Sequence, residues 1–406
     1  MTTIPSAQVV QRALRATTER LAHELARPTG ETPNWSEFEW RAARAAAAIH
    51  GVGPLLADTL QGQGPPGWQS FLADQRTHTR ERHERIEQLA QCIDRHAREA
   101  GIPMVALKGA ALHHMGFYIA GERPMADLDF LVEEPDLGAA SALLEAQSFR
   151  EELDCWRNRV FKPNGSTAGG LGEHRDNQIK VELHWRIRER LPLELTDISD
   201  VIYPRKPQPG LNPYPSLAAL LMHLVLHAAG GMACGELRLM HLNDLKRVCG
   251  RMQDEDWQAI LRFGESGAQA PWWFLPPLQL AGRYYPDIVP RPILLELQNS
   301  CPARLRRFTA QRCLTDVSLS SVWIRAFPGI EWSRSAKESF RFMVRRVRPD
   351  AEARRIRKSD TANAAWGPDS GWQGLSQKSR IVRWLTSRPT RPATMYVIRE
   401  TLARPL

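Results

Sequence analysis

The chain contains few cysteines, and no two of them form a Cys-x-x-Cys pair. The six cysteines of the 406-residue sequence stand at positions 92, 155, 234, 249, 301 and 313. Because zinc ribbons and redox motifs need closely spaced thiols, this scatter supports neither of them. The density of cysteine is also too low for a disulfide scaffold, so we expect reduced thiols in a cytoplasm.

Long uninterrupted apolar runs are absent too. Residues 1–5 lead into a polar, Arg-containing stretch without the apolar segment of a signal peptide. The most apolar run, 217–234, is short for a membrane span and is interrupted by His223 and His227. We therefore predict a cytoplasmic protein without a membrane partner.

The composition is that of an ordinary globular protein, but its charge is unevenly distributed. Hydrophobic residues make up 43% of the chain, charged residues 24%, and the net charge is +9. Residues 301–406 contain 22 Lys and Arg against 8 Asp and Glu, a balance of +14, so the other 300 residues carry −5. This asymmetry is compatible with a nucleic-acid partner. No interleaved aromatic motif accompanies it, so we favour a solvated Arg-rich surface.

Periodicity and turn residues divide the chain into four regions, and the predicted fold class is α+β, a mixed sheet flanked by N- and C-terminal helical regions. The regions are a helical part at 1–99, a compact α/β core at 100–195, a second helical part at 196–300 and a basic, partly flexible part at 301–406. Within the last, the polar stretch 350–379 is the expected flexible linker.

Short apolar runs within the core predict strands, and longer periodic runs predict helices. Strands are predicted at 101–107, 127–132 and 178–185, with one or two more in 149–161. Helices are predicted at 110–117 and 135–147 in the core and at 216–229, 236–249 and 254–263 beyond it. Residues 192–215 are expected to form a proline-rich connection.

An acidic pair, Asp127 and Asp129, begins the strand at 127–132. Side chains two apart on a strand point to the same face, with Cα atoms about 6.6 Å apart. Carboxylates so placed can share divalent ions, since metal pairs in phosphoryl-transfer sites lie roughly 3.5–4 Å apart. Oxygen ligands suit Mg²⁺ or Mn²⁺. Two like charges beside a core are costly unless a cation neutralises them, which favours a metal site.

Further residues extend this hypothesis. Glu182, on the strand at 178–185, can supply a third carboxylate ligand and assist deprotonation of an acceptor hydroxyl. Lys108 and Gly109 follow a strand, where the glycine permits close approach of a phosphate and the lysine supplies a point charge. Arg123, just before the acidic strand, can hold a phosphate in bidentate fashion.

Each of these features has a simpler explanation when taken alone. Most Asp-x-Asp pairs are surface residues, Lys-Gly after a strand is usually a turn, and a single strand glutamate is often exposed. What argues for a site is the order of the features within about a hundred residues. A strand, Lys-Gly, a helix, an arginine, the Asp-x-Asp strand and the strand glutamate follow one another.

Other candidates are weaker. His223 and His227 have the spacing of zinc ligands on a helix, but the glutamate of a metalloprotease motif is missing, so helix packing is favoured. Cys155 has no recognisable catalytic partner. The Gly-rich stretch 164–172 lacks the Gly-Lys-Ser/Thr end of a P-loop and is expected to be a turn or lid. His184 is expected on the site face of its strand as a supporting group.

Three sequence blocks, at 100–112, 123–129 and 181–185, resemble the uncharacterised bacterial nucleotidyltransferase family of the polymerase-β-like superfold. The likeness covers roughly residues 35–250. It implies a minimal nucleotidyltransferase core in which the two aspartates and the strand glutamate bind Mg²⁺ and an NTP. One departure lies at the turn after the first strand. Better-studied branches carry Gly-Ser there, whereas this chain has Lys108-Gly109-Ala110 and no hydroxyl.

We therefore expect a Mg²⁺- or Mn²⁺-dependent transfer of a nucleoside monophosphate from an NTP to a small-molecule, peptide or protein acceptor. Two alternatives stay open: a catalytically silent nucleotide-binding or partner-binding module of a biosynthetic cluster, and a nucleic-acid-modifying nucleotidyltransferase that uses residues 301–406 to hold the polynucleotide. The expected catalytic and metal-binding residues are Asp127, Asp129 and Glu182, and the expected nucleotide-binding residues are Lys108, Gly109 and Arg123.

Overall fold

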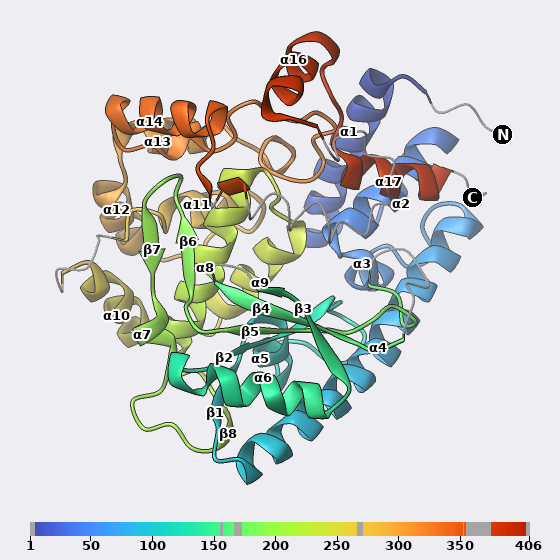
Figure 1. Cartoon of the computed structure of the whole chain (residues 1–406). Coiled ribbons are helices and arrows are strands. Elements are labelled where there is room, and N and C mark those ends of the chain that lie inside the picture. The colour runs from blue at the N-terminus through green and yellow to red at the C-terminus, as the bar shows by residue number, and fades with distance from the viewer. Residues whose placement is uncertain are drawn as a thin grey trace.

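A computed structural model gives the arrangement of the chain and describes residues 5–154, 157–165, 173–265, 271–351, 353–354 and 375–402. The predicted α+β class is confirmed, because a six-stranded mixed sheet is flanked by helices from both ends of the chain (Figure 1). The predicted Gly-rich turn at 164–172 and Cys155 lie largely or wholly outside the described residues.

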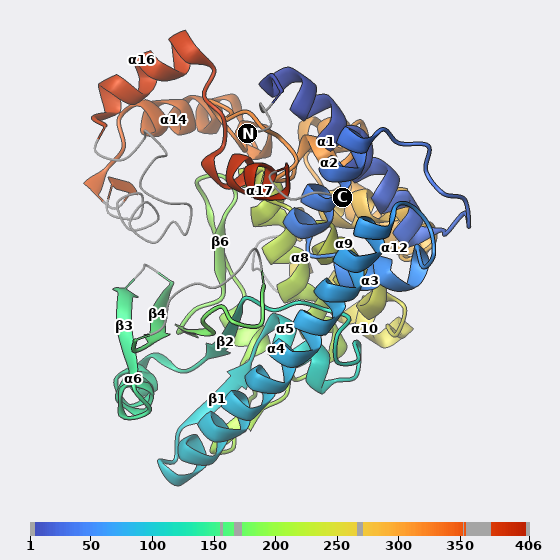
Figure 2. The ribbon, with the colours of Figure 1, turned by 90° about the vertical axis from the view of Figure 1, so that its right-hand side faces the viewer.

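The N-terminal region is helical, as expected, with α1 Ala7–Ala26, α2 Glu37–His50, α3 Gly53–Thr59 and α4 Pro66–Glu99. Ser36 caps α2: its hydroxyl accepts from the Glu39 backbone N–H, and the Glu39 carboxylate accepts from the Ser36 backbone N–H in return. The 34-residue α4 runs alongside the sheet (Figure 2), so this helix carries the N-terminal region to the core.

The strands of the main sheet lie in the order β3-β4-β5-β2-β1-β8. The central pair, β2 and β5, is parallel, β4 pairs antiparallel with both β3 and β5, and β1 is antiparallel to β2 and parallel to β8. The strand bounds are β1 Pro103–Ala106, β2 Asp127–Leu131, β3 Phe149–Asp154, β4 Asn158–Pro163, β5 Lys180–His184 and β8 Gly210–Asn212, with helices α5 Lys108–His114, η1 Glu134–Asp136 and α6 Leu137–Ala146 between them.

The sheet extends beyond the expected core boundary at residue 195. Strand β8 comes from the stretch expected to be a proline-rich connection, and the Gly210 N–H donates to the Ile102 carbonyl at 2.9 Å. A strand of three residues is too short to show alternation in the sequence. The same stretch also holds β7 Leu195–Asp197, which pairs with β6 Arg188–Arg190 just before it in a small second sheet, and α7 Ser199–Ile202.

The two faces of the central strands have different surroundings. Leu128 and Phe130 of β2 and Leu183 of β5 are fully buried against α4 and α6. The alternate residues of β2, which include both aspartates, face the other way, toward the helical half of the molecule. One face of the sheet therefore packs as core, while polar side chains occupy part of the other.

The second helical region begins with the long apolar helix α8 Leu217–Cys234. It is long and apolar enough to cross a membrane, but 78% of it is buried inside the molecule, as a core helix would be. The helices that follow are α9 Leu239–Cys249, α10 Asp254–Glu265, α11 Leu275–Tyr284, α12 Arg291–Ser300, α13 Ala303–Ala310, α14 Ala336–Val347, α16 Gln377–Ser387 and α17 Pro392–Leu402, with short turns η2 Leu314–Asp316 and η3 Ile330–Trp332.

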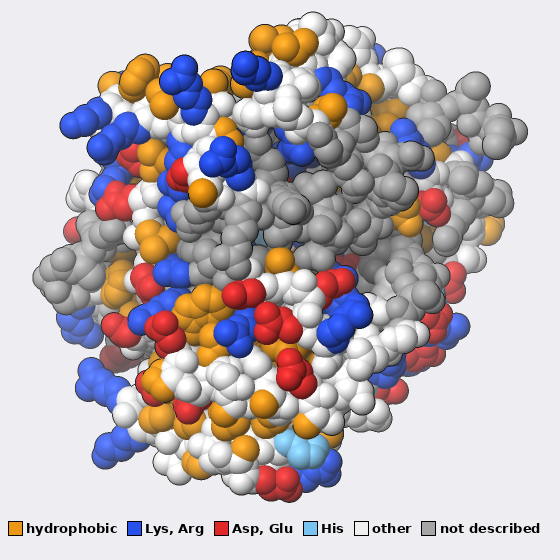
Figure 3. All heavy atoms as spheres, viewed as in Figure 1, with side chains coloured by type: hydrophobic (Ala, Val, Ile, Leu, Met, Phe, Trp, Pro, Cys, Tyr) orange, Lys and Arg blue, Asp and Glu red, His pale blue; other side chains and the backbone are white. Residues whose placement is uncertain are grey.

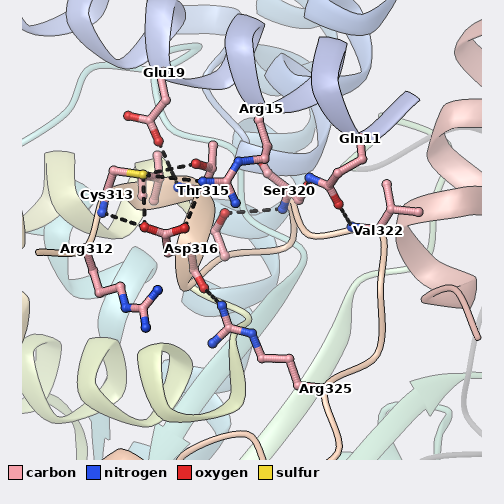
Figure 4. A network of polar contacts seen from close by, with 12 residues as sticks. Gln11, Arg15, Glu19, Arg312, Cys313, Thr315, Asp316, Ser320, Val322 and Arg325 are labelled. Carbon is pink, nitrogen blue, oxygen red and sulfur yellow. Dashed lines mark hydrogen bonds and ion pairs between the residues drawn. The ribbon is translucent and has the colours of Figure 1, made fainter. Parts of the chain in front are cut away.

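Part of the basic C-terminal region is tied to the N-terminal helices. Figure 4 shows α1 above the segment that contains η2, where the Arg15 guanidinium lies 2.8 Å from the Asp316 carboxylate and Gln11 accepts from the Val322 N–H at 2.6 Å. Helix α17 packs on α2. Lys and Arg side chains stand out at the surface over α14 (Figure 3). The linker expected at 350–379 lies mostly outside the described residues.

Candidate active site

The parallel pairing of β2 with β5 brings the predicted carboxylates together. Asp129 is in register with Glu182, and Asp127 lies two residues earlier on the same face of β2. His184 lies two residues after Glu182, on the same face of β5, as predicted. Two segments more than fifty residues apart in sequence thus form one acidic cluster.

Asp129 is the most heavily engaged residue of this cluster. Its Oδ1 atom accepts from the Lys108 ammonium at 2.9 Å and from His184 Nε2 at 2.9 Å. His184 Nε2 also lies 3.5 Å from Glu182 Oε2, which accepts from the Asn158 amide at 2.6 Å. Lys108 and His184 therefore supply positive charge directly to Asp129.

These contacts shift the pKa values of the group. Burial by itself would raise the pKa of Asp129, but Lys108 and His184 hold it well below its usual range. Burial also opposes the shift at His184, whose pKa the hydrogen bonds to Asp129 and Glu182 raise. The Glu182 pKa is lowered against its burial, mainly by His184. Two ionised carboxylates beside a charged imidazolium is the arrangement these shifts favour.

Asp127 lacks such support. No residue in the described ranges donates a hydrogen bond to its carboxylate. Burial and the charges of Asp129 and Glu182 raise the pKa of Asp127 to about 7, while Lys108 and Lys180 oppose this rise. A carboxylate in this position gains from an additional cation, because the protein around it provides too little positive charge.

The donor set fits a divalent cation. One ligand atom each from Asp129, Glu182 and His184 lie within 4.8 Å of one another. Among the described residues, no donor reaches the Asp127 carboxylate, Asp129 Oδ2 or Glu182 Oε1. The carboxylate oxygens suit Mg²⁺ or Mn²⁺, whereas an imidazole is a more usual ligand of Zn²⁺ and other transition metals. The tight group contains His184 and does not include Asp127, so the assignment of Asp127 as a metal ligand stays a prediction.

The Lys108 turn is held in place from α8. Lys108 has φ +45°, a left-handed conformation that is uncommon for a residue with a side chain. Its N–H donates to the Tyr214 hydroxyl at 3.3 Å, and that hydroxyl is hydrogen-bonded to His223 Nδ1 at 2.7 Å. His223 is buried, so the predicted packing role is confirmed, and it supports the turn that carries Lys108.

Gly109 and Arg123 have partners that the sequence did not indicate. Both arms of the Arg123 guanidinium meet the Asp244 carboxylate at 2.9 Å, which differs from the expected bidentate contact to a phosphate. A Cβ at Gly109 would collide with the Arg123 guanidinium and lie 2.9 Å from Met125. The glycine therefore makes room for protein side chains, and the direct phosphate contacts of these two residues stay predictions.

Arg82 of α4 also supports the site, although no local sequence pattern predicted it. It is 2% exposed and donates to the carbonyls of Met125 and Ala126 at 2.6 Å, just before β2. It also donates to the carbonyls of Asn177 at 2.7 Å and Gln178 at 2.8 Å, just before β5. One guanidinium thus fixes the starts of both acidic strands. In the sequence, Arg82 stands within a run of charged residues, so its burial cannot be recognised from the local pattern.

Comparison with known proteins agrees with the resemblance seen in the sequence. A solved structure similar to the chain is MenT4, a nucleotidyltransferase toxin from Mycobacterium tuberculosis H37Rv, at 15% identity over 81% of this chain and 98% of that one, and its TM-score of 0.25 is too low to establish a shared fold. A search of curated proteins gave no match. Residues 36–276 match the sequence profile described as "Uncharacterised nucleotidyltransferase". Because this match spans more than half of the chain, the protein belongs to that uncharacterised nucleotidyltransferase family.

Proposed function

We propose that the cluster is a Mg²⁺- or Mn²⁺-dependent nucleotidyltransferase site with Asp127, Asp129 and Glu182 as metal ligands. The observation that carries this proposal is the register of β2 and β5. It places three carboxylates on one face, one of them without a hydrogen-bond donor in the described chain. Bound metal would neutralise the carboxylates and polarise a phosphoryl group.

The proposed reaction transfers a nucleoside monophosphate. An acceptor oxygen attacks the α-phosphorus of an NTP, the bond from that phosphorus to the bridging oxygen of the β-phosphate breaks, and pyrophosphate leaves. The acceptor hydroxyl loses its proton, for which Glu182 is the proposed base. The chain contributes mainly by positioning the reactants and fixing charge, as is usual in phosphoryl transfer.

Lys108 has two roles in this proposal. Without metal its ammonium neutralises Asp129 at 2.9 Å. With a cation bound at the carboxylates, the Lys108 ammonium would be available for a phosphate oxygen, in a turn that Tyr214 keeps in position. Arg123 is proposed to act through Gly109, because its guanidinium fills the space that a side chain at residue 109 would take. Its pairing with Asp244 keeps the guanidinium in place.

A silent nucleotide-binding module is the second candidate. The Lys108–Asp129 ion pair favours it, because a lysine that stays on the central aspartate would exclude one metal. The missing hydroxyl at residues 108–111 points in the same direction. Both candidates keep an NTP as the ligand and a cytoplasmic location, and they differ in whether a small molecule, peptide or protein is modified.

Labelled NTPs separate these candidates. The purified protein is incubated with each of the four α-labelled NTPs, Mg²⁺ or Mn²⁺, and a cell lysate that supplies acceptors. The transferase predicts transfer of label to a product, lost in Asp129→Asn. Metal-dependent NTP binding without any labelled product in lysate would favour the silent module, and absence of NTP binding would contradict both.

A further inference from the structure

The cations expected to bind phosphate are already paired within the protein. The Lys108 ammonium lies 2.9 Å from Asp129, and the Arg123 guanidinium lies 2.9 Å from Asp244. Binding a polyphosphate through either one requires that an ion pair be broken or shared. A cation without a carboxylate partner would meet a polyanion at lower cost.

Lys180 is such a cation. It is the first residue of β5 and is in register with Asp127 of β2. Residues in register on neighbouring parallel strands share a face, as do residues two apart on one strand, so Lys180 lies on the face of Asp127 and Glu182. Its side chain is half-buried and forms no ion pair with any residue that the structure describes.

Two nearby cations, in contrast, are already ion-paired within the protein. On the neighbouring strand β4, Lys162 is ion-paired with Glu152 of β3, and at the other end of the cluster the Arg157 guanidinium lies 2.6 Å from Glu189. The charge of Lys180 also reaches Asp127, where it acts with Lys108 against the effect of burial and of the neighbouring carboxylates. Lys180 therefore lies close to the acidic cluster without forming an ion pair with any of its carboxylates.

We propose that Lys180 is a contact for the terminal phosphates of a nucleoside triphosphate. The inference rests on the proposed function, since it names the residue that receives the polyphosphate of the same site. Lys180 precedes Glu182 on β5, whereas His184 follows it, so the lysine stands at one end of the carboxylate row. That end accommodates the pyrophosphate part of the substrate, while the α-phosphate lies over the carboxylates.

Inorganic tripolyphosphate tests this contact without knowledge of the base. Its binding with Mg²⁺ is measured by calorimetry for the wild-type chain, Lys180→Met, Lys180→Arg and Lys162→Met. Lys180→Met is expected to raise the Kd at least about tenfold, as loss of a charge-assisted hydrogen bond does. Lys180→Arg should stay within about threefold, because its charge is retained.

The Lys162→Met variant removes the same charge from the adjacent strand, and its Kd should stay within about threefold of the wild type, since Lys162 is already paired with Glu152. Thermal melting verifies that each variant is folded. Equal tripolyphosphate affinity of folded Lys180→Met and wild type would overturn the role of Lys180 alone. If the wild type binds neither tripolyphosphate nor any NTP, the proposed function itself fails, and Lys180 loses its ligand with it.

Discussion

At the scale of single residues, the candidate site combines one well-neutralised carboxylate with one that lacks support. Asp129 receives Lys108 and His184, whereas Asp127 receives no hydrogen bond from the described chain. The sequence predicted both aspartates on one face because the i, i+2 rule is local. It did not predict their unequal surroundings, because those depend on side chains from β1–α5 and β5.

Asp127→Asn tests this inequality. Without metal, the substitution removes a charge that its neighbours repel, so the variant should be more stable than the wild type, by on the order of 1–2 kcal/mol. Urea unfolding with EDTA at pH 8 measures the difference. Added Mn²⁺ should then stabilise the wild type and leave the variant nearly unchanged. A variant less stable than the wild type in EDTA would show that Asp127 has a structural partner.

His50 gives a residue-scale prediction about pH. Its Nδ1 accepts from the Leu239 N–H at 2.9 Å and its Nε2 meets Ser320 Oγ at 2.7 Å, so the buried ring is neutral, and burial lowers its pKa to about 3. A group whose folded pKa lies below its unfolded value of 6.5 destabilises the fold as pH falls below 6.5. The loss between pH 6.5 and 5 should be about 2 kcal/mol.

The control for this effect is His50→Gln, which is less stable at pH 7 but carries no titrating ring. Its free energy of unfolding should fall by less than that of the wild type between pH 6.5 and 5, as measured in urea. The other buried histidines still titrate in both proteins, so only the difference between them reports on His50. Equal pH dependence in the two proteins would contradict the assignment.

At the scale of elements, strong local patterns predicted most of the core. The apolar runs predicted β1, β2 and β5 within a few residues, and the periodic stretches predicted α8 and α9. The three-residue strand β8 was missed because it has too few residues to alternate. The parallel register of β2 and β5, which makes the site, could not be predicted either, because no local rule relates strands so far apart.

Arg82 links α4 to the segments just before β2 and β5, so a substitution there should affect both strands. Arg82→Met leaves several carbonyls before β2 and β5 without a donor, each costing about 1–3 kcal/mol, so we expect a loss of at least about 3 kcal/mol. Urea unfolding measures this loss. Arg82→Lys restores some of the donors. It should therefore recover part of the lost stability and bind Mn²⁺ more tightly than Arg82→Met.

Arg85 provides the matched control on the same helix. It is exposed, and its side chain donates a hydrogen bond to the Arg175 carbonyl, so Arg85→Met should change stability by less than about 0.5 kcal/mol. Similar losses in both variants would show that α4 contributes through general charge and not through the clamp at Arg82.

At the scale of the whole molecule, the ends of the chain meet. Residues 301–406 were predicted to form a basic, partly flexible region, yet α17 packs on α2 and η2 on α1. Buried contacts of this kind are invisible to a charge count. Truncation at residue 301 would therefore damage the fold as well as remove charge, and it is unsuitable for testing nucleic-acid binding.

Ile398→Ala tests the packing of the C-terminal helix α17 on the N-terminal helix α2. Ile398 on α17 is 3% exposed, so the substitution should cost about 2–4 kcal/mol and lower a single cooperative unfolding transition. Val382→Ala, at a position on α16 that is 58% exposed, should have little effect. Calorimetry that instead resolves a separate early transition in Ile398→Ala would show that the C-terminal helices fold on their own.

The most direct test of the central claim is Mn²⁺-dependent NTP binding by the double variant Asp127→Asn, Asp129→Asn. Electron paramagnetic resonance of Mn²⁺, titrated with each NTP, reports metal and nucleotide binding in one sample, and melting verifies the fold. We predict that the wild type binds Mn²⁺–NTP and that the folded double variant loses at least about a hundredfold in affinity, two charged ligands being removed. Equal Mn²⁺–NTP affinity in the wild type and the double variant would contradict the claim that these aspartates hold the metal.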